Sequence, residues 1–204
     1  MPIIITDFEQ GSEDWFAAKA GSPGASSSDK IITTTGARSK QRDDFMMQLA
    51  GERICGKCEE TFQSLAMQKG IEREEAARSF FELVQGVEVK KVGIVFKDEW
   101  KLCHCSPDAL IGDNSGLEQK NPMMKTHVKY LLAGKLPTDY FSQVQMSLYV
   151  TERESWWFMS AYEGLPPLII ECHRDEVFIK KLEVELNEFN GELLAMVEKL
   201  KGRV

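Results

Sequence analysis

Two carboxylates and one lysine near the middle of the sequence have the types and spacing of a catalytic group. Asp108 comes first, and Glu118 and Lys120 follow it after a short interval. Residues 112–116 between them read Gly-Asp-Asn-Ser-Gly, and these residue types dominate tight turns. Successive side chains of a strand alternate between its faces, so a strand over residues 117–120 points Glu118 and Lys120 the same way. A β-hairpin would therefore bring Asp108 beside the other two charges.

Such a group suits the hydrolysis of a phosphodiester. Mg²⁺ binds oxygen ligands and keeps several waters, so one or two carboxylates are enough to hold it. The bound ion lowers the pKa of a water ligand and neutralises charge on a phosphate. A neighbouring ammonium can orient that water or stabilise the charge that develops. The alternative is an ordinary Glu–Lys pair on a surface hairpin, which contributes little to stability. Spacing alone does not decide between the two interpretations.

The residues around this hairpin resemble the PD-(D/E)xK nuclease motif. Within that superfamily, the order of several segments is similar to that in the branch of phage lambda exonuclease and YqaJ-type viral recombinase nucleases. These segments are Glu74-x-x-Ala77-Arg78, Cys105-Ser106-Pro107-Asp108, Gly116-Leu117-Glu118-x-Lys120-x-Pro122 and Gln143-Val144-Gln145. The resemblance runs from about Trp15 to the C-terminal helix. Gln119 is a departure, because the family usually has an aliphatic residue there, whose backbone carbonyl binds a metal.

The resemblance implies an α/β fold with a central mixed β-sheet flanked by helices, as in restriction endonucleases. It also implies a site with two Mg²⁺ ions, for which Mn²⁺ can substitute. The expected metal ligands are Asp108, Glu118 and the carbonyl of Gln119. The expected catalytic residues are Lys120, Gln145 and Glu74. Gln143 and Gln145 point to roughly opposite sides of a helix, so only one of them can face the site.

A serine- and glycine-rich loop over residues 22–29 precedes a predicted helix start near residue 27 or 28. Backbone N–H groups at such a start can bind an anion, although plain helix capping is the simpler role for a serine. By resemblance, Lys19, Ser26 and Ser106 would hold the 5′-phosphate of the cut strand. Lys19 stands where the related exonuclease has an arginine. A lysine would bind the phosphate through a single ammonium group instead of through the two parallel N–H groups of a guanidinium.

Three further residues are candidates for contact with DNA, Met67 by the resemblance and two lysines by their spacing. Met67 matches an apolar position that wedges between the strands at the duplex end, although methionine more often fills a core. Lys125 and Lys129 lie one helical turn apart and are expected to contact the DNA backbone, with a solvated helix face as the alternative.

The implied activity is processive 5′-to-3′ digestion of one strand of linear double-stranded DNA by a homotrimeric ring. The resulting 3′ overhang would pass to a phage single-strand annealing protein. Two other functions stay open at this point. One is a PD-(D/E)xK endonuclease, or a nuclease of other polarity. The other is a non-enzymatic module that binds DNA or carries zinc.

Composition sets limits on these interpretations. The 204 residues, 43% of them hydrophobic, fit one nuclease domain over residues 1–204. No apolar run approaches the roughly 20 residues of a membrane span, and the first residues show neither a basic region nor an apolar segment of signal length, so we expect a cytoplasmic protein. The net charge of −7 is unusual for a DNA-binding protein, which normally needs a basic surface. Metal-binding carboxylates and an acidic segment over the last 30 residues, turned away from DNA, would reconcile the two.

The five cysteines are expected to be reduced thiols. Cys55 and Cys58 form one CxxC pair, and Cys103 and Cys105 form a Cys-x-Cys pair. One CxxC without a second is a weak zinc signal.

Hydrophobic spacing predicts the elements that position these residues. Helices are expected from Ser12 to about Gly21, over residues 40–55, over residues 63–84, from Asp139 or Ser142, and from Asp175 to the C-terminus. Strands are expected over residues 87–96, 102–105, 117–120, 155–162 and 168–172.

Overall fold

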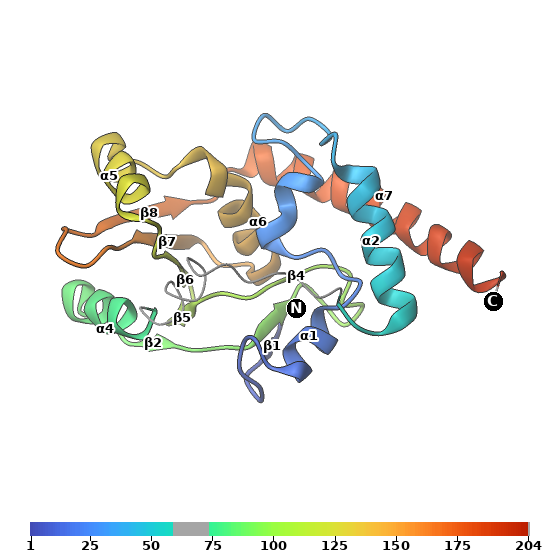
Figure 1. Ribbon diagram of the computed structural model, residues 1–204, viewed down its shortest axis with the longest axis horizontal. Helices are drawn as coiled ribbons and strands as arrows, with labels where there is room; N and C mark the ends of the chain where they lie inside the picture. Colours follow the sequence, from blue (N-terminus) through green and yellow to red (C-terminus); the bar gives the residue numbers. More distant parts are fainter. Residues whose placement is uncertain (59–73, 204) are drawn as a thin grey trace.

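The computed structural model of the protein describes residues 1–58 and 74–203. A mixed five-stranded sheet with the order β2-β5-β6-β7-β8 lies at its centre (Figure 1). Its strands are β2 (Val89–Lys90), β5 (Ala109–Ile111), β6 (Ser115–Lys120), β7 (Ser155–Ser160) and β8 (Leu168–His173). β6 and β7 run parallel, whereas the other neighbouring strands are antiparallel. The predicted mixed sheet, with the β5–β6 hairpin at its centre, is confirmed.

A second sheet has the order β1-β3-β4. Its strands are β1 (Ile3–Ile5), β3 (Ile94–Phe96) and β4 (His104–Cys105). The single strand predicted over residues 87–96 is wrong, because β2 and β3 belong to different sheets. The chain leaves the first sheet after β2 and enters the second at β3, and Gly93 lies between these two strands. A Cβ added at Gly93 would lie 2.6 Å from the carbonyl oxygen of Phe8. The N-terminal segment at Phe8 therefore packs directly against the backbone between β2 and β3.

The described helices follow the sequence patterns closely, whereas residues 63–73 of the helix predicted over residues 63–84 lie outside the described part of the chain. Ser12 caps α1, and its hydroxyl accepts a hydrogen bond of 3.2 Å from the backbone N–H of Trp15. The expected start near residue 27 or 28 lies earlier, because a 3₁₀-helix already begins at Ala25. The helical segments are α1 (Glu13–Lys19), η1 (Ala25–Lys30), α2 (Arg42–Cys55), α4 (Glu74–Gln85), α5 (Met124–Ala133), η2 (Thr138–Tyr140), α6 (Phe141–Thr151) and α7 (Glu176–Lys201).

The two faces of the large sheet are covered by different helices. Leu117 of β6 points to one face, where it packs with Phe81 of α4. Trp156 and Phe158 of β7 point to the other face and join a larger core, to which α2, α6 and α7 contribute. The alternation of side chains along the strands thus places α4 and α6 on opposite faces of the sheet.

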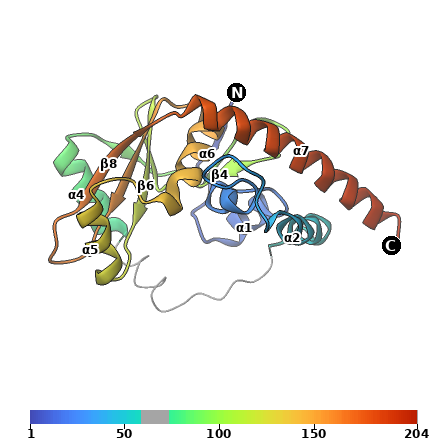
Figure 2. The same cartoon turned by 90° about the horizontal axis from the view of Figure 1, so that it is seen from above.

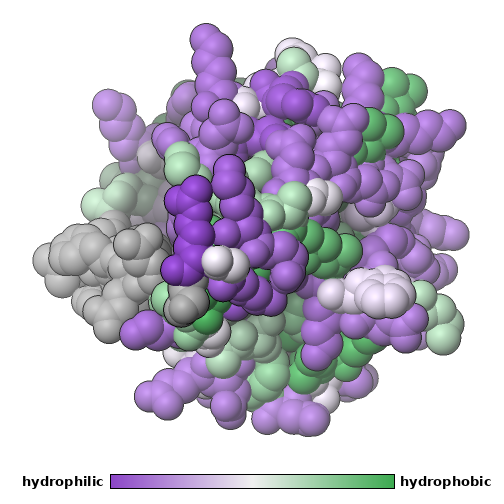
Figure 3. All heavy atoms as spheres, turned by 90° about the vertical axis from the view of Figure 1, so that its right-hand side faces the viewer, coloured by the Kyte–Doolittle hydropathy of each residue, from purple (hydrophilic) through white to green (hydrophobic). Residues whose placement is uncertain are grey.

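The acidic helix α7 lies away from α4 and α5. Figures 1 and 2 show that it runs along the molecule and ends at the opposite extremity. Glu192 of α7 lies 2.6 Å from the buried guanidinium of Arg42, and Arg38 forms a 3.0 Å ion pair with Glu185. The face at this extremity is largely hydrophilic (Figure 3). The six glutamates of α7 are partly balanced by its four lysines, so this helix carries only a small part of the net charge of −7.

Within residues 1–58 and 74–203, none of the helices combines the length and the apolar character needed to cross a membrane.

Candidate active site

The β5–β6 hairpin holds Asp108 against the strand that carries the other two charges. Ala109 of β5 pairs with Leu117 of β6, and the backbone N–H of Asp108 donates to the Leu117 carbonyl at 3.1 Å. The carboxylate of Asp108 in turn accepts a hydrogen bond of 2.5 Å from the backbone N–H of Gln119. Asp108 is therefore fixed beside the end of β6, as the spacing of the residues predicts.

Glu118 and Lys120 lie on one face of β6, as strand alternation requires. The Lys120 Nζ atom lies 2.5 Å from a carboxylate oxygen of Glu118, which is 4% exposed. Burial of Lys120 opposes its charge, but the Glu118 and Asp108 carboxylates outweigh this effect and raise the pKa of the ammonium. Lys120 therefore remains a cation at the centre of the cluster. Its Nζ also lies 5.3 Å from the centre of the Tyr140 ring.

The carboxylates are crowded enough to favour a bound cation. Burial and, next, the negative charge of Glu118 together raise the pKa of Asp108 to about 8, although Lys120 and the Gln119 N–H act in the opposite direction. A divalent cation between the carboxylates would remove this repulsion. The Gln119 carbonyl offers a third oxygen, because the N–H and C=O of one strand residue face the same edge, and its N–H already faces Asp108. The donor set therefore fits Mg²⁺.

Within residues 1–58 and 74–203, no three His, Cys, Asp or Glu side chains come together as a metal-binding group. Cys103 and Cys105 are buried in the core, and burial raises the pKa of the Cys103 thiol to about 12. Both therefore pack as neutral, apolar side chains.

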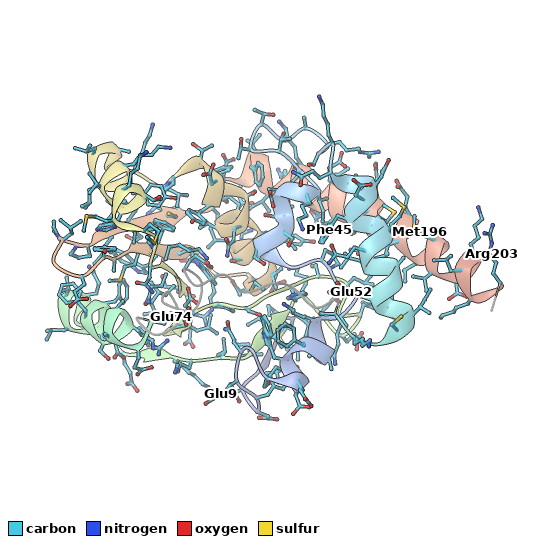
Figure 4. All side chains as sticks on the ribbon, viewed as in Figure 1. Glu9, Phe45, Glu52, Glu74, Met196 and Arg203 are labelled. Atoms are coloured by element: carbon cyan, nitrogen blue, oxygen red, sulfur yellow. The ribbon has the colours of Figure 1, made fainter. Side chains whose placement is uncertain are left out.

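Glu74 is the first residue of α4, the helix on the other face of the sheet, and it lies close to the Asp108, Glu118 and Lys120 cluster. It shares with Asp108 the lining of a cavity of about 380 Å³, which Glu9 also borders (Figure 4). The side-chain amide of Gln119 donates to the Glu74 carbonyl at 3.1 Å, which ties the start of α4 to β6. Burial raises the pKa of Glu74, while Arg78 and Lys120 oppose this shift. Glu74 thus lies within electrostatic reach of the cluster, as the resemblance implies.

A second cavity of about 170 Å³ lies beside η1 and α2. Lys19 and Ser26 line it, together with Glu52 and Phe45, which Figure 4 marks on α2. Burial lowers the pKa of the Lys19 ammonium, although the neighbouring Cys58 and Glu52 act in the opposite direction. The structure therefore brings two of the three residues expected to bind the 5′-phosphate to one cavity.

Comparison with known proteins decides the family. The sequence model of the YqaJ-like viral recombinase domain matches residues 14–154. The chain belongs to this family. The crystal structure of an alkaline exonuclease (LHK-Exo) from Laribacter hongkongensis is 31% identical, with a TM-score of 0.85 over 94% of this chain and 97% of that chain. A structure of LHK-Exo in complex with dAMP matches with the same values.

A more distant structure shares the fold of this YqaJ-like domain. A phage related exonuclease from Haemophilus somnus 129PT is 16% identical, with a TM-score of 0.66 over 88% of this chain and 96% of that chain. No curated protein sequence matches the chain.

Trp15 connects the expected phosphate-binding residues of this YqaJ-like domain, and its role was not evident from the sequence. Its indole N–H donates to the Ser106 hydroxyl at 2.9 Å and to the Gly93 carbonyl at 3.1 Å. The Lys19 Nζ atom lies 3.7 Å from the centre of the Trp15 ring. Because the Ser106 oxygen accepts from Trp15, its own hydrogen remains to donate elsewhere. Trp15 therefore positions both Lys19 and Ser106.

The geometry does not support the predicted role of Gln145. Its amide nitrogen donates to the His173 carbonyl at 2.9 Å, and its oxygen accepts from the backbone N–H of Asp175 at 2.8 Å. His173 pairs with Ser155, which pairs with Ser115, so Gln145 is anchored near the start of β6. Glu118 lies three residues after Ser115 in β6, and this separation is roughly 10 Å at the rise per residue of a strand. The side chain therefore joins β8 to α7 and does not reach the cluster, which leaves Gln143 as the amide to test.

Arg153 is a second structural residue that the sequence did not reveal. This buried side chain donates to three carbonyls of the β5–β6 turn, at 3.2 Å to Ile111, 2.8 Å to Gly112 and 2.6 Å to Ser115. The guanidinium thereby fixes the hairpin that carries the site of the YqaJ-like domain.

The remaining predicted DNA contacts lie on the surface or beyond the described residues. Lys125 and Lys129 are exposed on α5, which suits a solvated helix face as well as contact with DNA. Met67 lies outside the residues that the structure describes.

Proposed function

We propose that this YqaJ-family nuclease is a Mg²⁺-dependent exonuclease that digests one strand of linear double-stranded DNA from its 5′ end. The convergence of Asp108, Glu118 and Lys120 at the end of the β5–β6 hairpin carries the proposal. The likeness to LHK-Exo, whose structure is that of an alkaline exonuclease, supports it at the level of the whole fold.

The side chains of the cluster have separate parts in this reaction. Asp108, Glu118 and the Gln119 carbonyl would hold Mg²⁺, which supplies an activated water and neutralises charge on the phosphate. Lys120 stays charged and would orient the water oxygen for attack in line with the leaving oxygen. Glu74, at the edge of the cavity, is the additional carboxylate available if two ions bind.

The proposed assembly is a homotrimeric ring that works processively and leaves a 3′ overhang for a phage single-strand annealing protein. A ring offers a solution to the net charge of −7, because only the residues that line its channel need to be basic.

Linear duplex DNA labelled separately at each 5′ and 3′ end provides the test of polarity. With Mg²⁺, we expect release of the 5′ label first and of the 3′ label late, while a closed circular duplex of the same sequence stays intact. Early release of the 3′ label would show the opposite polarity. Cutting of the circle would favour an endonuclease, and digestion of neither substrate would favour a DNA-binding module.

Replacement of Lys19 tests recognition of the 5′-phosphate. We expect Lys19→Ala to reduce the preference for 5′-phosphorylated over 5′-hydroxyl ends by about tenfold, because a charge-assisted hydrogen bond is lost. Trp15→Phe should give a smaller reduction, since it keeps a ring under Lys19 but loses the N–H that orients Ser106. The measurement is the initial digestion rate on both kinds of end.

Lys40→Ala is the matched control, because Lys40 is exposed and does not line the cavity. Equal losses on both kinds of end in Lys19→Ala would exclude a role for Lys19 in phosphate recognition.

A further inference from the structure

Two cations line the cavity beside Asp108 and have no part in the hydrolysis described above. Arg78 of α4 is 6% exposed, and Lys91 follows β2. Both border the cavity of about 380 Å³ that also contains Asp108 and Glu74, a volume within the range of small-ligand pockets. The cavity therefore has an acidic side, toward the metal ligands, and a basic side.

Both cations converge on a single oxygen atom. The Lys91 Nζ atom lies 3.2 Å from Oε2 of Glu75, and the Arg78 guanidinium donates to the same oxygen. The side chain of Glu75 is 72% exposed, whereas that of Arg78 is only 8% exposed. The Glu75 carboxylate is itself well solvated outside the pair, and a phosphate that takes its place would keep the buried Arg78 guanidinium paired with an anion. Arg78, held by burial, would remain with its donors directed at the vacated position.

The cavity wall on the N-terminal side is already in place. The side-chain amide of Gln10 donates to the Pro107 carbonyl at 2.8 Å and to the Val92 carbonyl at 3.1 Å. These bonds fix the N-terminal segment to the residue before Asp108 and to the residue after Lys91. The cations therefore face a preformed space that adjoins the Asp108 carboxylate.

We propose that Arg78 and Lys91 form a phosphate-binding subsite, in which Glu75 is a resident anion that the phosphate displaces. An arginine fork and a lysine ammonium around one anionic oxygen are the donors that a phosphate group takes. The subsite rests on the proposed function, since it would hold a second phosphate while another lies at the metal ligands. The ligand is either a backbone phosphate of the bound strand or the nucleotide that the reaction releases.

Equilibrium titrations in EDTA test the subsite without cutting. One probe is a short single-stranded oligonucleotide without terminal phosphates, and the other is a deoxynucleoside 5′-monophosphate. We expect Lys91→Ala to weaken binding of at least one probe roughly three- to tenfold, because one charged contact to phosphate is lost. Glu75→Gln should strengthen binding of the same probe by a similar factor, because the competing anion is removed.

Two neighbours provide matched controls for charge. Lys90→Ala and Glu88→Gln make the same changes at exposed positions that do not line the cavity, and both should leave binding within about twofold. A response of the oligonucleotide alone supports a backbone phosphate as the ligand, and a response of the mononucleotide alone supports the released product. Equal effects of Lys90→Ala and Lys91→Ala, or weaker binding to Glu75→Gln, would overturn the proposal.

The two proposals fail in different experiments. If digestion of DNA does not depend on Mg²⁺ and Glu118, the catalytic proposal is lost, but the titrations in EDTA are unaffected. If the titrations show no effect of Glu75→Gln and Lys91→Ala, only the subsite is lost.

Discussion

Glu118→Gln is expected to reduce Mg²⁺-dependent digestion of linear duplex DNA by at least about a thousandfold. The substitution keeps the shape of the side chain but removes a negative charge that is 4% exposed and lies beside Asp108 and Lys120. A divalent cation held by two carboxylates would lose one of them, together with the transition-state stabilisation that the ion supplies. Initial rates on end-labelled duplex are the measurement, beside DNA binding in EDTA, which should persist.

Glu171→Gln is the matched control, because Glu171 is an exposed glutamate on β8 of the same sheet. It should leave both the digestion rate and the melting temperature unchanged. If Glu118→Gln retains more than about a tenth of the wild-type rate while remaining folded, Glu118 is not a metal ligand. If it lowers the melting temperature and the rate only in proportion to the unfolded fraction, its role is structural.

Gly116→Ala is expected to destabilise the protein by about 3 kcal/mol or more, at the upper end of the usual cost of overpacking a core. A Cβ at this position would lie 2.3 Å from a ring carbon of Trp156, which pairs with Gly116 across β6 and β7. Trp156 is fully buried, so its ring has no free space into which to move. For a protein of this size, the melting temperature should fall by roughly 6–12 °C, measurable by circular dichroism.

Gly191→Ala provides the opposite expectation. Gly191 lies in the interior of α7, and an added Cβ there would meet nothing within 4 Å. Alanine loses less backbone entropy than glycine when a helix forms, so the melting temperature should stay the same or rise slightly. If Gly116→Ala leaves the melting temperature unchanged, the Trp156 ring does not pack against β6 as described.

The local elements of the site could be predicted from the sequence because each depends on neighbouring residues. The turn residues over 112–116 specify a hairpin, and the period of two along β6 places Glu118 and Lys120 on one face. Ser12, with acidic residues after it, marks the start of α1 in the same way. The carboxylate–lysine cluster was therefore determined largely by local sequence.

The tertiary structure alone decided which distant residues meet at the site. Trp15 reaches Ser106, Arg153 caps the turn that follows Ile111, and Gln145 is bound to β8 and α7 although its position in the sequence suggested the active site. The break at Gly93 was equally invisible, because it depends on the N-terminal segment passing against it. Periodicity and turn composition specify the direction of a side chain on its own helix or strand. They carry no information on which remote backbone or charge lies opposite, and that depends on how the whole chain packs.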